Sequence, residues 1–366
     1  MNEDLKFKIA ITLIPGVGPV LARNLISYCG GIEAVFREKE SRLVKIPEIG
    51  PVTAHAIAHH DVFDRAEAEC LFIEQNEIAA FFYLDNDYPQ RLKNCSDAPL
   101  LLYFKGKADL NKERIVAIVG TRNATDYGKT VTEKLVQELS QHDVLIISGL
   151  AYGIDIYAHK ACVLNNICNI GVLAHGLDRI YPGNHKGTTK KMVTNGGLLT
   201  EFPSQTNPDR ENFPSRNRIV AGMSDAIIVV ESAEKGGSLI TADIANSYNR
   251  DVFAVPGNIN QQYSRGCNEL IRDNKAALIN SANDLLKMMS WDTSEKNTTK
   301  KQRELFIEFT GEEKLLVDVL SDNPSIDIDT IATTTKIPLG KASALLLRLE
   351  LNGIVKSLPG KQYQLA

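Results

Sequence analysis

Between Arg114 and Asn280, short apolar runs alternate with helix-like segments, and this alternation constrains the fold more than any other feature. We expect a mostly parallel sheet, because strands separated by helices return to the same edge of a sheet. In such sheets, ligands bind beyond the carboxyl ends of the strands. Function is therefore expected in the loops that follow the apolar runs, which occupy residues 115–120, 144–149, 169–176, 197–203, 226–232, 251–257 and 276–280.

The first of these loops reads GTRNATDYG and begins at Gly120. A dinucleotide-binding fold would continue with further glycines here and would carry an acid at the end of the second strand. This chain has Arg122 instead, and its second strand ends in Ser148 and Gly149. Gly120 permits a tight turn, the helix that follows favours an anion, and a guanidinium suits phosphate oxygens and bases. We interpret Arg122 as a phosphate-binding residue, with a surface salt bridge as the alternative. The nearby Asp155 could cap a helix or orient Arg122, and we favour the structural role.

The later loops are basic and contain aromatic residues. From Tyr181 to Gly222, six bases stand against three acids in a chain with a net charge of −4. Cations that follow a backbone and rings that meet bases are typical of sites for single-stranded nucleic acid. A further glycine-rich loop offers backbone N–H groups to an anion. The candidate residues in these loops are Lys186, Phe213, Arg216, Asn217, Arg218, Gly237 and Ser238.

The same loops contain no nucleophile paired with a base, no Walker lysine, no paired carboxylates and no metal-ligand cluster. We read His175 and His185 as loop residues rather than ligands. The pattern therefore indicates a phosphate polymer that is held rather than cut, with no catalytic residues, cofactor or metal.

The N-terminal segment contains an imperfect repeat. IPGVGPVLARNLI begins at Ile14, and IPEIGPVTAHAI begins at Ile46, 32 residues later. Each copy resembles a helix-hairpin-helix unit, in which glycines let backbone N–H groups approach a DNA phosphate. Glu48 replaces Gly16 in the second copy, which weakens phosphate binding there. Packing alone and DNA contact both remain open for this segment.

The predicted domains are a helical domain over 1–61, a Rossmann-like core over 62–290, a linker over 291–310 and a winged helix over 311–366. The core opens with a helix, a short strand over 79–84 and a turn-rich stretch over 85–106. Three helices and a terminal hairpin indicate the winged helix. That domain has seven acids and six bases, so we expect protein contact or weak DNA contact from it.

Composition excludes several classes of protein. The six cysteines form no C-x-x-C pair and are expected to be reduced, as in the cytoplasm. No apolar run approaches the roughly 18 residues of a membrane span. The polar N-terminus is unlike a signal peptide.

The motifs G-T-R, S-G-L-A-Y-G-I-D, G-L-D-R-I-Y-P, F-P-S-R-N-R-I-V-A-G, G-S-L-I-T-A, V-P-G and G-C-N-E-L-I occur in this order. Together they closely resemble the DNA-processing protein A family, also called DprA or Smf, most strongly from Asp85 to Leu286. The resemblance implies an extended Rossmann-like α/β core flanked by a helical, SAM-like domain and a winged helix.

The resemblance also implies a function. Such proteins are bacterial and cytoplasmic, act in natural transformation, bind and protect incoming single-stranded DNA, help to load the RecA recombinase, and form homodimers through the core. The family's DNA-binding arginine falls on Arg122 and its lysine on Lys186. The Arg-Asn-Arg cluster falls on Arg216 and Arg218, and the glycine nest falls on Gly237 and Ser238.

Two other classes compete with this interpretation. Nucleotide monophosphate phosphoribohydrolases share a related core and a glycine-rich phosphate loop, loosely like residues 234–243. They also require a glutamate beside that loop, where this chain has Thr241, Ala242 and Asp243. A pure adaptor that had lost DNA binding would leave the basic residues of the loops unexplained.

Overall fold

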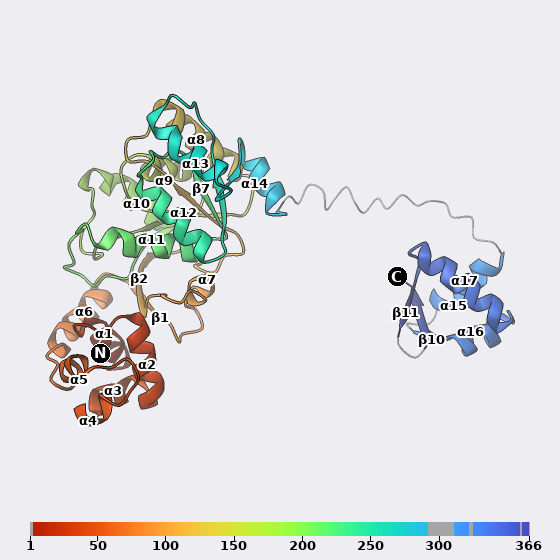
Figure 1. Ribbon diagram of the computed structural model, residues 1–366, viewed down its shortest axis with the longest axis horizontal. Helices are drawn as coiled ribbons and strands as arrows, with labels where there is room; N and C mark the ends of the chain where they lie inside the picture. Colours follow the sequence, from red (N-terminus) through yellow and green to blue (C-terminus); the bar gives the residue numbers. More distant parts are fainter. Residues whose placement is uncertain (1–2, 292–310, 322–324, 359–360, 366) are drawn as a thin grey trace. The chain divides into compact units, whose positions relative to one another are not determined.

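The computed structural model describes residues 3–291, 311–321, 325–358 and 361–365. The chain divides into two compact units, Met1–Asp292 and Thr293–Ala366, and each is described by itself (Figure 1). Apart from Trp291, the predicted linker over 291–310 lies outside the described residues. Among the described helices, none is long and apolar enough to cross a membrane.

Within residues 3–291, nine strands form one sheet in the order β1-β2-β6-β5-β4-β3-β7-β8-β9. The pairs β1–β2 and β2–β6 are antiparallel, and the remaining neighbours are parallel. The mostly parallel sheet is therefore confirmed, and each of the seven apolar runs contains a strand. The strands are β1 (Ala79–Phe82), β2 (Leu101–Gly106), β3 (Ile115–Val119), β4 (Leu145–Ser148), β5 (Asn169–Val172), β6 (Gly197–Thr200), β7 (Ala226–Val229), β8 (Asp251–Ala254) and β9 (Ala277–Leu278).

Strand β2 was missed by the sequence analysis, which treated residues 85–106 as turn-rich. It pairs with β1 and β6 and extends the sheet beyond its parallel part. The stretch before it contains a short helix, α7 (Gln90–Lys93). The apolar run from Leu100 to Phe104 carried the signal for this strand, but the polar residues before it obscured that signal.

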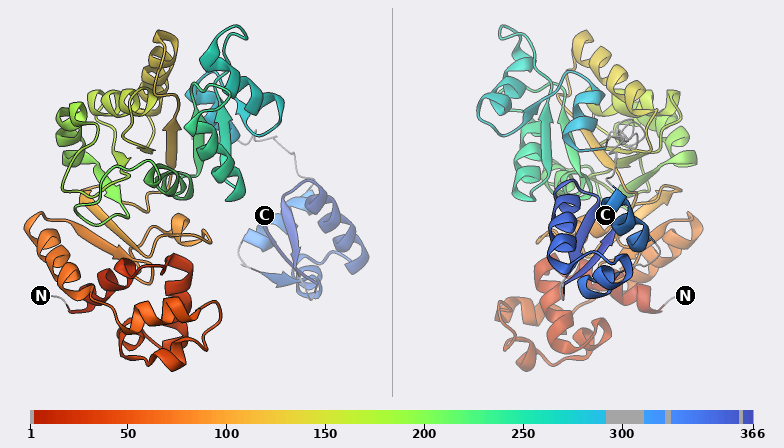
Figure 2. Two further views of the ribbon diagram at one scale, coloured as in Figure 1. Left: turned by 60° about the vertical axis from the view of Figure 1, so that its left-hand side comes forward. Right: turned by 90° about the vertical axis from the view of Figure 1, so that its right-hand side faces the viewer.

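Helices cover both faces of the sheet (Figures 1 and 2). On one face, α8 (Asp126–Leu139), α9 (Ile154–Leu164) and α14 (Ala282–Met288) share an apolar cluster with Val116 and Ile118. On the other face, α11 (Asn212–Met223), α12 (Gly237–Ser247) and α13 (Arg265–Arg272) pack with Ala117 and Val119. All five residues of β3 are buried, which explains why these strands are apolar throughout rather than alternating.

The connections place a ligand site at β3. The chain passes from β3 to its neighbour β4 on one side and only later reaches β7 on the other side. The strand order thus reverses at β3, and a crevice opens where loops diverge beyond the carboxyl ends of such strands.

Six helices precede the sheet and share one apolar cluster, which extends onto β1 and β2 through Phe82, Leu101 and Tyr103. This cluster contains residues from α6, so α6 packs with the N-terminal helices as well as against the sheet. The helices are α1 (Glu3–Leu13), α2 (Pro19–Cys29), α3 (Ile32–Arg37), α4 (Glu40–Leu43), α5 (Pro51–Ala58) and α6 (Phe63–Gln75).

The two copies of the N-terminal repeat adopt the same backbone. Both α2 and α5 begin with a proline after an extended glycine. Gly16 has φ +80°, and Glu48, at the equivalent place, has φ +68°. The second hairpin therefore keeps a left-handed position without the glycine that usually occupies it. The Glu48 carboxylate accepts a hydrogen bond from Asn24 Nδ2 at 3.3 Å.

The second unit has the predicted three helices and terminal hairpin. Strands β11 and β12 form the hairpin, and a short additional strand, β10, pairs with β12. The two cations of α17 are both engaged by acids of α15, because Lys341 contacts Glu312 at 2.7 Å and Arg348 contacts Glu313 at 3.5 Å. The elements are α15 (Gly311–Ser321), β10 (Ile326–Asp327), α16 (Ile328–Thr335), α17 (Leu339–Leu351), β11 (Val355–Leu358) and β12 (Gln362–Leu365).

Candidate nucleic-acid interface

A crevice of about 760 Å³ lies beyond the carboxyl ends of β3, β4 and β7, where the strand order reverses. The loops after β3, β4, β5, β6 and β7, the starts of α11 and α12, and residues 262–263 form its walls. Its basic lining residues are Arg122, Arg210, Arg216 and Lys235, and Asp155 is the acid among the lining residues. Of the candidate residues, Gly120, Arg122, Gly149, Phe213, Arg216, Asn217, Gly237 and Ser238 all line this crevice.

Arg122 and Phe213 meet across the crevice. Arg122 is exposed, and its guanidinium carbon lies 5.0 Å from the centre of the Phe213 ring. Among the described residues, Arg122 forms no ion pair, so the salt-bridge alternative gains no support. The contact holds the guanidinium over an aromatic face, where the quadrupole of the ring attracts it. A free cation and a half-buried ring therefore stand side by side at the mouth of the site.

Arg216 lies deeper, on the floor of the crevice. It is 7% exposed, its Nη1 donates to the Val172 carbonyl at 2.8 Å, and its Nε donates to Asn217 Oδ1 at 3.0 Å. Burial lowers the pKa of Arg216, and the negative charge of Asp155 opposes that shift. A Cβ on Gly149 would lie 2.1 Å from Arg216 Nη1 and 2.4 Å from Asp155 Oδ2, so the missing side chain makes room for both groups. Asp155 therefore faces Arg216 rather than Arg122.

The positive N-terminus of α8 is already occupied by an acid of this chain. Buried Glu231, just after β7, accepts a hydrogen bond from the Thr125 amide at 2.9 Å and another from the Thr125 hydroxyl. Thr125 in turn caps α8 by accepting from the Gly128 amide at 3.2 Å. A carboxylate of the chain itself therefore lies where the sequence predicts an external anion. Glu231 fixes the loop that carries Arg122 instead.

The N-terminus of α12 remains open to the crevice. Gly237 is exposed, and the space that its Cβ would occupy is empty. Ser238 is buried, and its hydroxyl hydrogen bonds to Ser232 Oγ at 3.0 Å. Lys235 lines the same wall and forms no ion pair among the described residues. The backbone N–H groups of the first turn and this lysine can together receive one phosphate.

Gly120 and Ser148 hold the backbone around the crevice in place. A Cβ on Gly120 would lie 2.4 Å from the side chain of Ile154, so a larger residue would separate the first loop from α9. Ser148 is fully buried, and its hydroxyl donates to the Ile118 carbonyl at 2.6 Å. The Ser148 side chain therefore supports the crevice and does not line it.

Arg218 does not reach the crevice. Residues 212–223 form helix α11, whereas the sequence analysis treated Arg216, Asn217 and Arg218 as a cluster in a loop. Residues two apart on a helix point in different directions. Arg218 turns toward Glu201, with which it forms a partly buried ion pair, and also donates to the Asp97 carbonyl. Desolvation raises the pKa of Glu201 to about 7, although Arg218 acts to lower it.

Lys186 lies beside a second, adjoining hollow rather than in the crevice. It is exposed at the start of α10 (Lys186–Asn195) and forms no ion pair among the described residues. The hollow of about 330 Å³ next to it shares Arg122 with the crevice and is also lined by Tyr152, Tyr157, Lys160 and His185.

Sequence reasoning missed several cations on this surface. The Nζ atoms of Lys129 and Lys160 lie 5.6 and 5.9 Å from the centre of the Tyr157 ring. Like Lys235, neither lysine forms an ion pair in the described part of the chain. The spacing from Tyr157 to Lys160 is a helical one, and it was the available signal for this pair.

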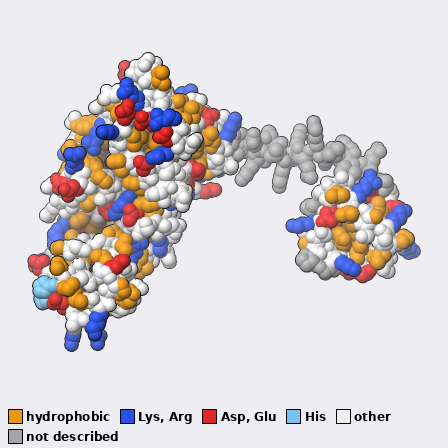
Figure 3. Space-filling model, in the orientation of Figure 1, with side chains coloured by type: hydrophobic (Ala, Val, Ile, Leu, Met, Phe, Trp, Pro, Cys, Tyr) orange, Lys and Arg blue, Asp and Glu red, His pale blue; other side chains and the backbone are white. Residues whose placement is uncertain are grey.

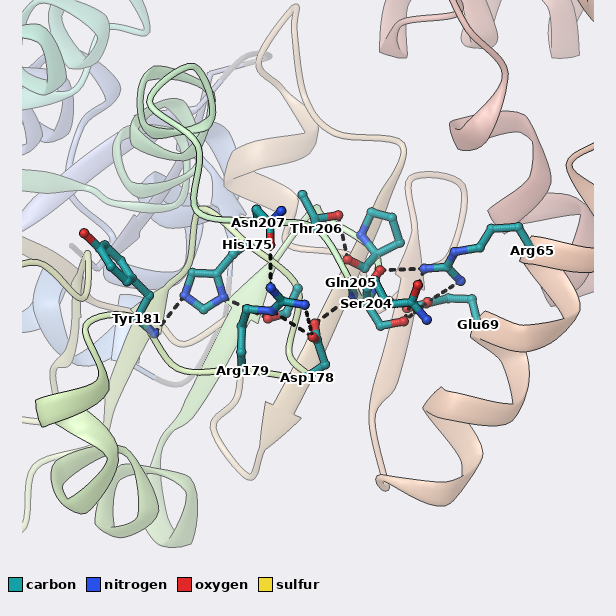
Figure 4. Close-up of polar contacts among 12 residues, drawn as sticks. Arg65, Glu69, His175, Asp178, Arg179, Tyr181, Ser204, Gln205, Thr206 and Asn207 are labelled. Carbon is teal, nitrogen blue, oxygen red and sulfur yellow. Dashed lines mark hydrogen bonds and ion pairs between the residues drawn. The ribbon is translucent and has the colours of Figure 1, made fainter.

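A polar network holds the wall that leads to Phe213 (Figure 4). Buried Glu69 on α6 accepts from Arg65 Nη1 at 2.8 Å and from the Ser204 amide at 2.8 Å. One residue further on, the Gln205 amide donates to Asp178 Oδ1 at 2.9 Å. The loop is therefore tied both to α6 and to the loop after β5.

His175 belongs to the same network and positions an aromatic residue. It is buried, its Nδ1 hydrogen bonds to the Gly176 carbonyl at 2.8 Å, and its Nε2 accepts from the Tyr181 amide at 3.3 Å. Burial lowers the pKa of His175, which favours the neutral ring that both contacts require. Tyr181 is exposed at the edge of the crevice.

Comparisons with known proteins agree with this architecture. The profile described as DNA recombination-mediator protein A matches residues 79–290. The chain belongs to this family. The SAM-like helix-hairpin-helix tandem matches residues 8–59, and the DprA winged helix domain matches residues 302–361. The predicted resemblance and the fold class with its two flanking domains are therefore confirmed.

Individual relatives cover most of the chain. Protein Smf of Synechocystis sp. is 32% identical over 99% of this chain and 99% of its own length. The crystal structure of DNA processing protein A from Streptococcus pneumoniae matches with a TM-score of 0.67 and 33% identity, over 77% of this chain and 97% of that one. A structure of DNA processing protein A from Helicobacter pylori, described as showing a single-stranded DNA binding mode, matches with a TM-score of 0.54 and 30% identity, over 59% and 97% of the two chains.

Proposed function

We propose that this protein binds single-stranded DNA in the crevice beyond β3, β4 and β7. The observation that carries the proposal is the contact of Arg122 with the ring of Phe213, 5.0 Å away, at the mouth of the crevice. Among the described residues, Arg122 has no acidic partner that would compete with a phosphate. Arg122 and Lys235 contact phosphates, and a further phosphate lies at the open N-terminus of α12 beside Gly237. Phe213 and Tyr181 stack on bases, because aromatic rings accept every base.

Arg216 and Gly149 support the site from below. Arg216 adds positive charge at the floor of the crevice, with Asn217 fixing its orientation. Lys186 and the hollow that contains Lys160 extend the basic surface along the strand. Arg218 is left out of the proposed site, because its guanidinium is engaged by Glu201.

The proposed cellular role follows from the family. The protein acts in DNA processing during natural transformation, protects incoming strands and delivers them to the RecA recombinase. It works in the cytoplasm as a homodimer formed through the core, for which the segment from Val252 to Leu286 is the proposed face. Support for these steps comes from family membership and from the name recombination-mediator, and the crevice supplies the strand-binding step.

We further propose that the crevice holds DNA without cleaving it. Two glutamates lie at or just before the glycine-rich loop in the described part of the chain. Glu234 forms an ion pair with Arg265 at 3.1 Å, and the Glu231 carboxylate accepts two hydrogen bonds from Thr125. A phosphoribohydrolase requires a free glutamate at that place.

The winged helix contributes little to DNA affinity, since both cations of α17 contact acids of α15.

The test is fluorescence anisotropy of a labelled oligo-dT titrated with the full chain at several salt concentrations. Binding that weakens with salt and resists competition by unlabelled duplex is expected. The variant Phe213→Ala should lose about 1–3 kcal/mol of affinity if its ring stacks on a base. Equal displacement by duplex, or a Phe213→Ala variant that binds as tightly as the wild type, would contradict the proposal. Incubation with nucleoside monophosphates should release no free base.

A further inference from the structure

The N-terminal helices bring together two histidines and a glutamate that the sequence analysis did not combine. His55 lies on α5, His59 directly follows the end of this helix at Ala58, and Glu40 is the first residue of α4. The histidines are four residues apart, which places both imidazoles on one face of the helix. Figure 3 shows histidine surface next to acidic surface on this part of the molecule. From this cluster we infer a binding site for a borderline divalent cation such as Zn²⁺.

The distances between the donor atoms fit a metal ion. Glu40 Oε2 lies 3.4 Å from His55 Nδ1 and 3.6 Å from His59 Nδ1. All three donor atoms lie within 4.8 Å of one another. In a tetrahedral site with bonds of about 2.1 Å to nitrogen and oxygen, two ligand atoms are about 3.4 Å apart. Two of the three separations therefore already match the edge of such a tetrahedron.

The donor set selects the type of cation. Imidazole nitrogens suit Zn²⁺, Ni²⁺ and Cu²⁺, whereas Mg²⁺ and Ca²⁺ prefer sites made of oxygen ligands. The site has three protein ligands, so a fourth position remains for water. The side chains of His55, His59 and Glu40 are 64%, 59% and 39% exposed, so the ion can enter from and return to solvent.

Metal binding requires two hydrogen bonds to break. The first joins His55 Nδ1 to Glu40 Oε2 at 3.4 Å, and the ion would take its place between these two atoms. His59 Nδ1 lies 3.2 Å from the backbone carbonyl of His55, and this contact must break before the nitrogen can coordinate the ion. The two rings are already stacked, with centroids 4.2 Å apart and planes inclined by 29°. A bound ion would join α4 to the end of α5, and these two elements flank the hairpin that contains Glu48. The site would thus clamp the second hairpin of the N-terminal repeat.

The test is isothermal titration calorimetry of the full chain with Zn²⁺, after removal of bound metal with a chelator. One saturable site per chain is expected. His55→Ala and His59→Ala should each weaken binding at least tenfold, and Glu40→Gln should weaken it measurably. His142→Ala is the control, because this histidine lies on the core, outside the cluster, and should leave the affinity unchanged.

A second measurement distinguishes a variant that has lost metal binding from one that has lost its fold. The three side chains are exposed, so the variants should show the circular dichroism spectrum of the wild type. Zn²⁺ should raise the thermal unfolding midpoint of the wild type but not that of His55→Ala, because an ion stabilises the form that binds it. Absence of a saturable site would overturn the inference. It would also be overturned by a His55→Ala variant that binds with unchanged affinity, as binding by a cysteine would produce.

Discussion

Replacing Arg122 by alanine tests the proposed interface most directly. Arg122 is exposed, forms no ion pair among the described residues and lies over Phe213. Its removal should not disturb packing, so the variant should fold with the stability of the wild type. A charge-assisted hydrogen bond contributes about 1.5–3 kcal/mol, so affinity for oligo-dT at low salt should fall by about 10- to 150-fold.

The salt dependence gives a second, independent magnitude. Each phosphate contact of a single strand contributes about 0.7 to the slope of log K against log salt concentration. If Arg122 contacts one phosphate, the slope for Arg122→Ala should be about 0.7 shallower than that of the wild type. The assay is fluorescence anisotropy at four or more salt concentrations.

Arg218→Ala is the matched control, because it also removes an arginine near the crevice. Arg218 contacts Glu201 instead of lining the crevice, so the slope should stay unchanged. The variant should instead lose stability, since it leaves Glu201 buried without its partner. An unchanged slope for Arg122→Ala, or a shallower slope for a folded Arg218→Ala, would refute the reasoning.

The stability loss of Arg218→Ala should depend on pH. The pKa of Glu201 is raised to about 7 in the folded protein, from 4.5. The folded state therefore binds this proton more tightly than the unfolded chain, and the stability that it contributes is lost as pH rises through this range. Without Arg218, the pKa of Glu201 rises further. The destabilisation should therefore grow as pH rises above about 7, by up to about 1.4 kcal/mol per pH unit, as measured by urea unfolding.

Three further predictions concern other parts of the first unit. Glu69→Ala removes the carboxylate that holds the Ser204 amide, so it should lower the free energy of unfolding by about 2–4 kcal/mol in urea titrations and weaken DNA binding. Unchanged stability would mean that this network does not hold the wall. Lys129→Ala combined with Lys160→Ala should weaken binding of long oligo-dT more than that of short oligo-dT, with unchanged circular dichroism, whereas equal losses at every length would contradict an extended path. Glu48→Gly should raise the free energy of unfolding by up to about 1 kcal/mol, because glycine adopts a positive φ without strain, and a loss of stability would mean that the contact with Asn24 outweighs the strain.

The strand runs illustrate how far pattern alone determines the fold. Each of the seven apolar runs contains a strand, because a parallel strand that is covered on both faces has to be apolar throughout. Strand β2 was not predicted, because its apolar residues follow a turn-rich stretch. It also pairs antiparallel with its neighbours β1 and β6, outside the parallel part of the sheet.

Sequence patterns did not predict which side chains of the loops contact one another. Arg122 and Phe213 are 91 residues apart, yet the sequence placed both in loops at one edge of the sheet, and the structure brings them into contact. Arg218 was wrongly predicted to line the site, because residues 216–218 were treated as part of one loop rather than of a helix. The 3.6-residue repeat of α11 turns it away from Arg216.

The sequence by itself determined the fold class, the family and the edge of the sheet where the crevice lies, because hydrophobic periodicity and glycine motifs are local properties of the chain. Only the tertiary structure decided which charges are available there. Glu231 neutralises the N-terminus of α8, and Glu201 engages Arg218, whereas Arg122 and Lys235 remain free among the described residues. It also brought Glu40 beside His55. Partners distant in the sequence settle these questions, since the availability of a charge depends on what packs against it.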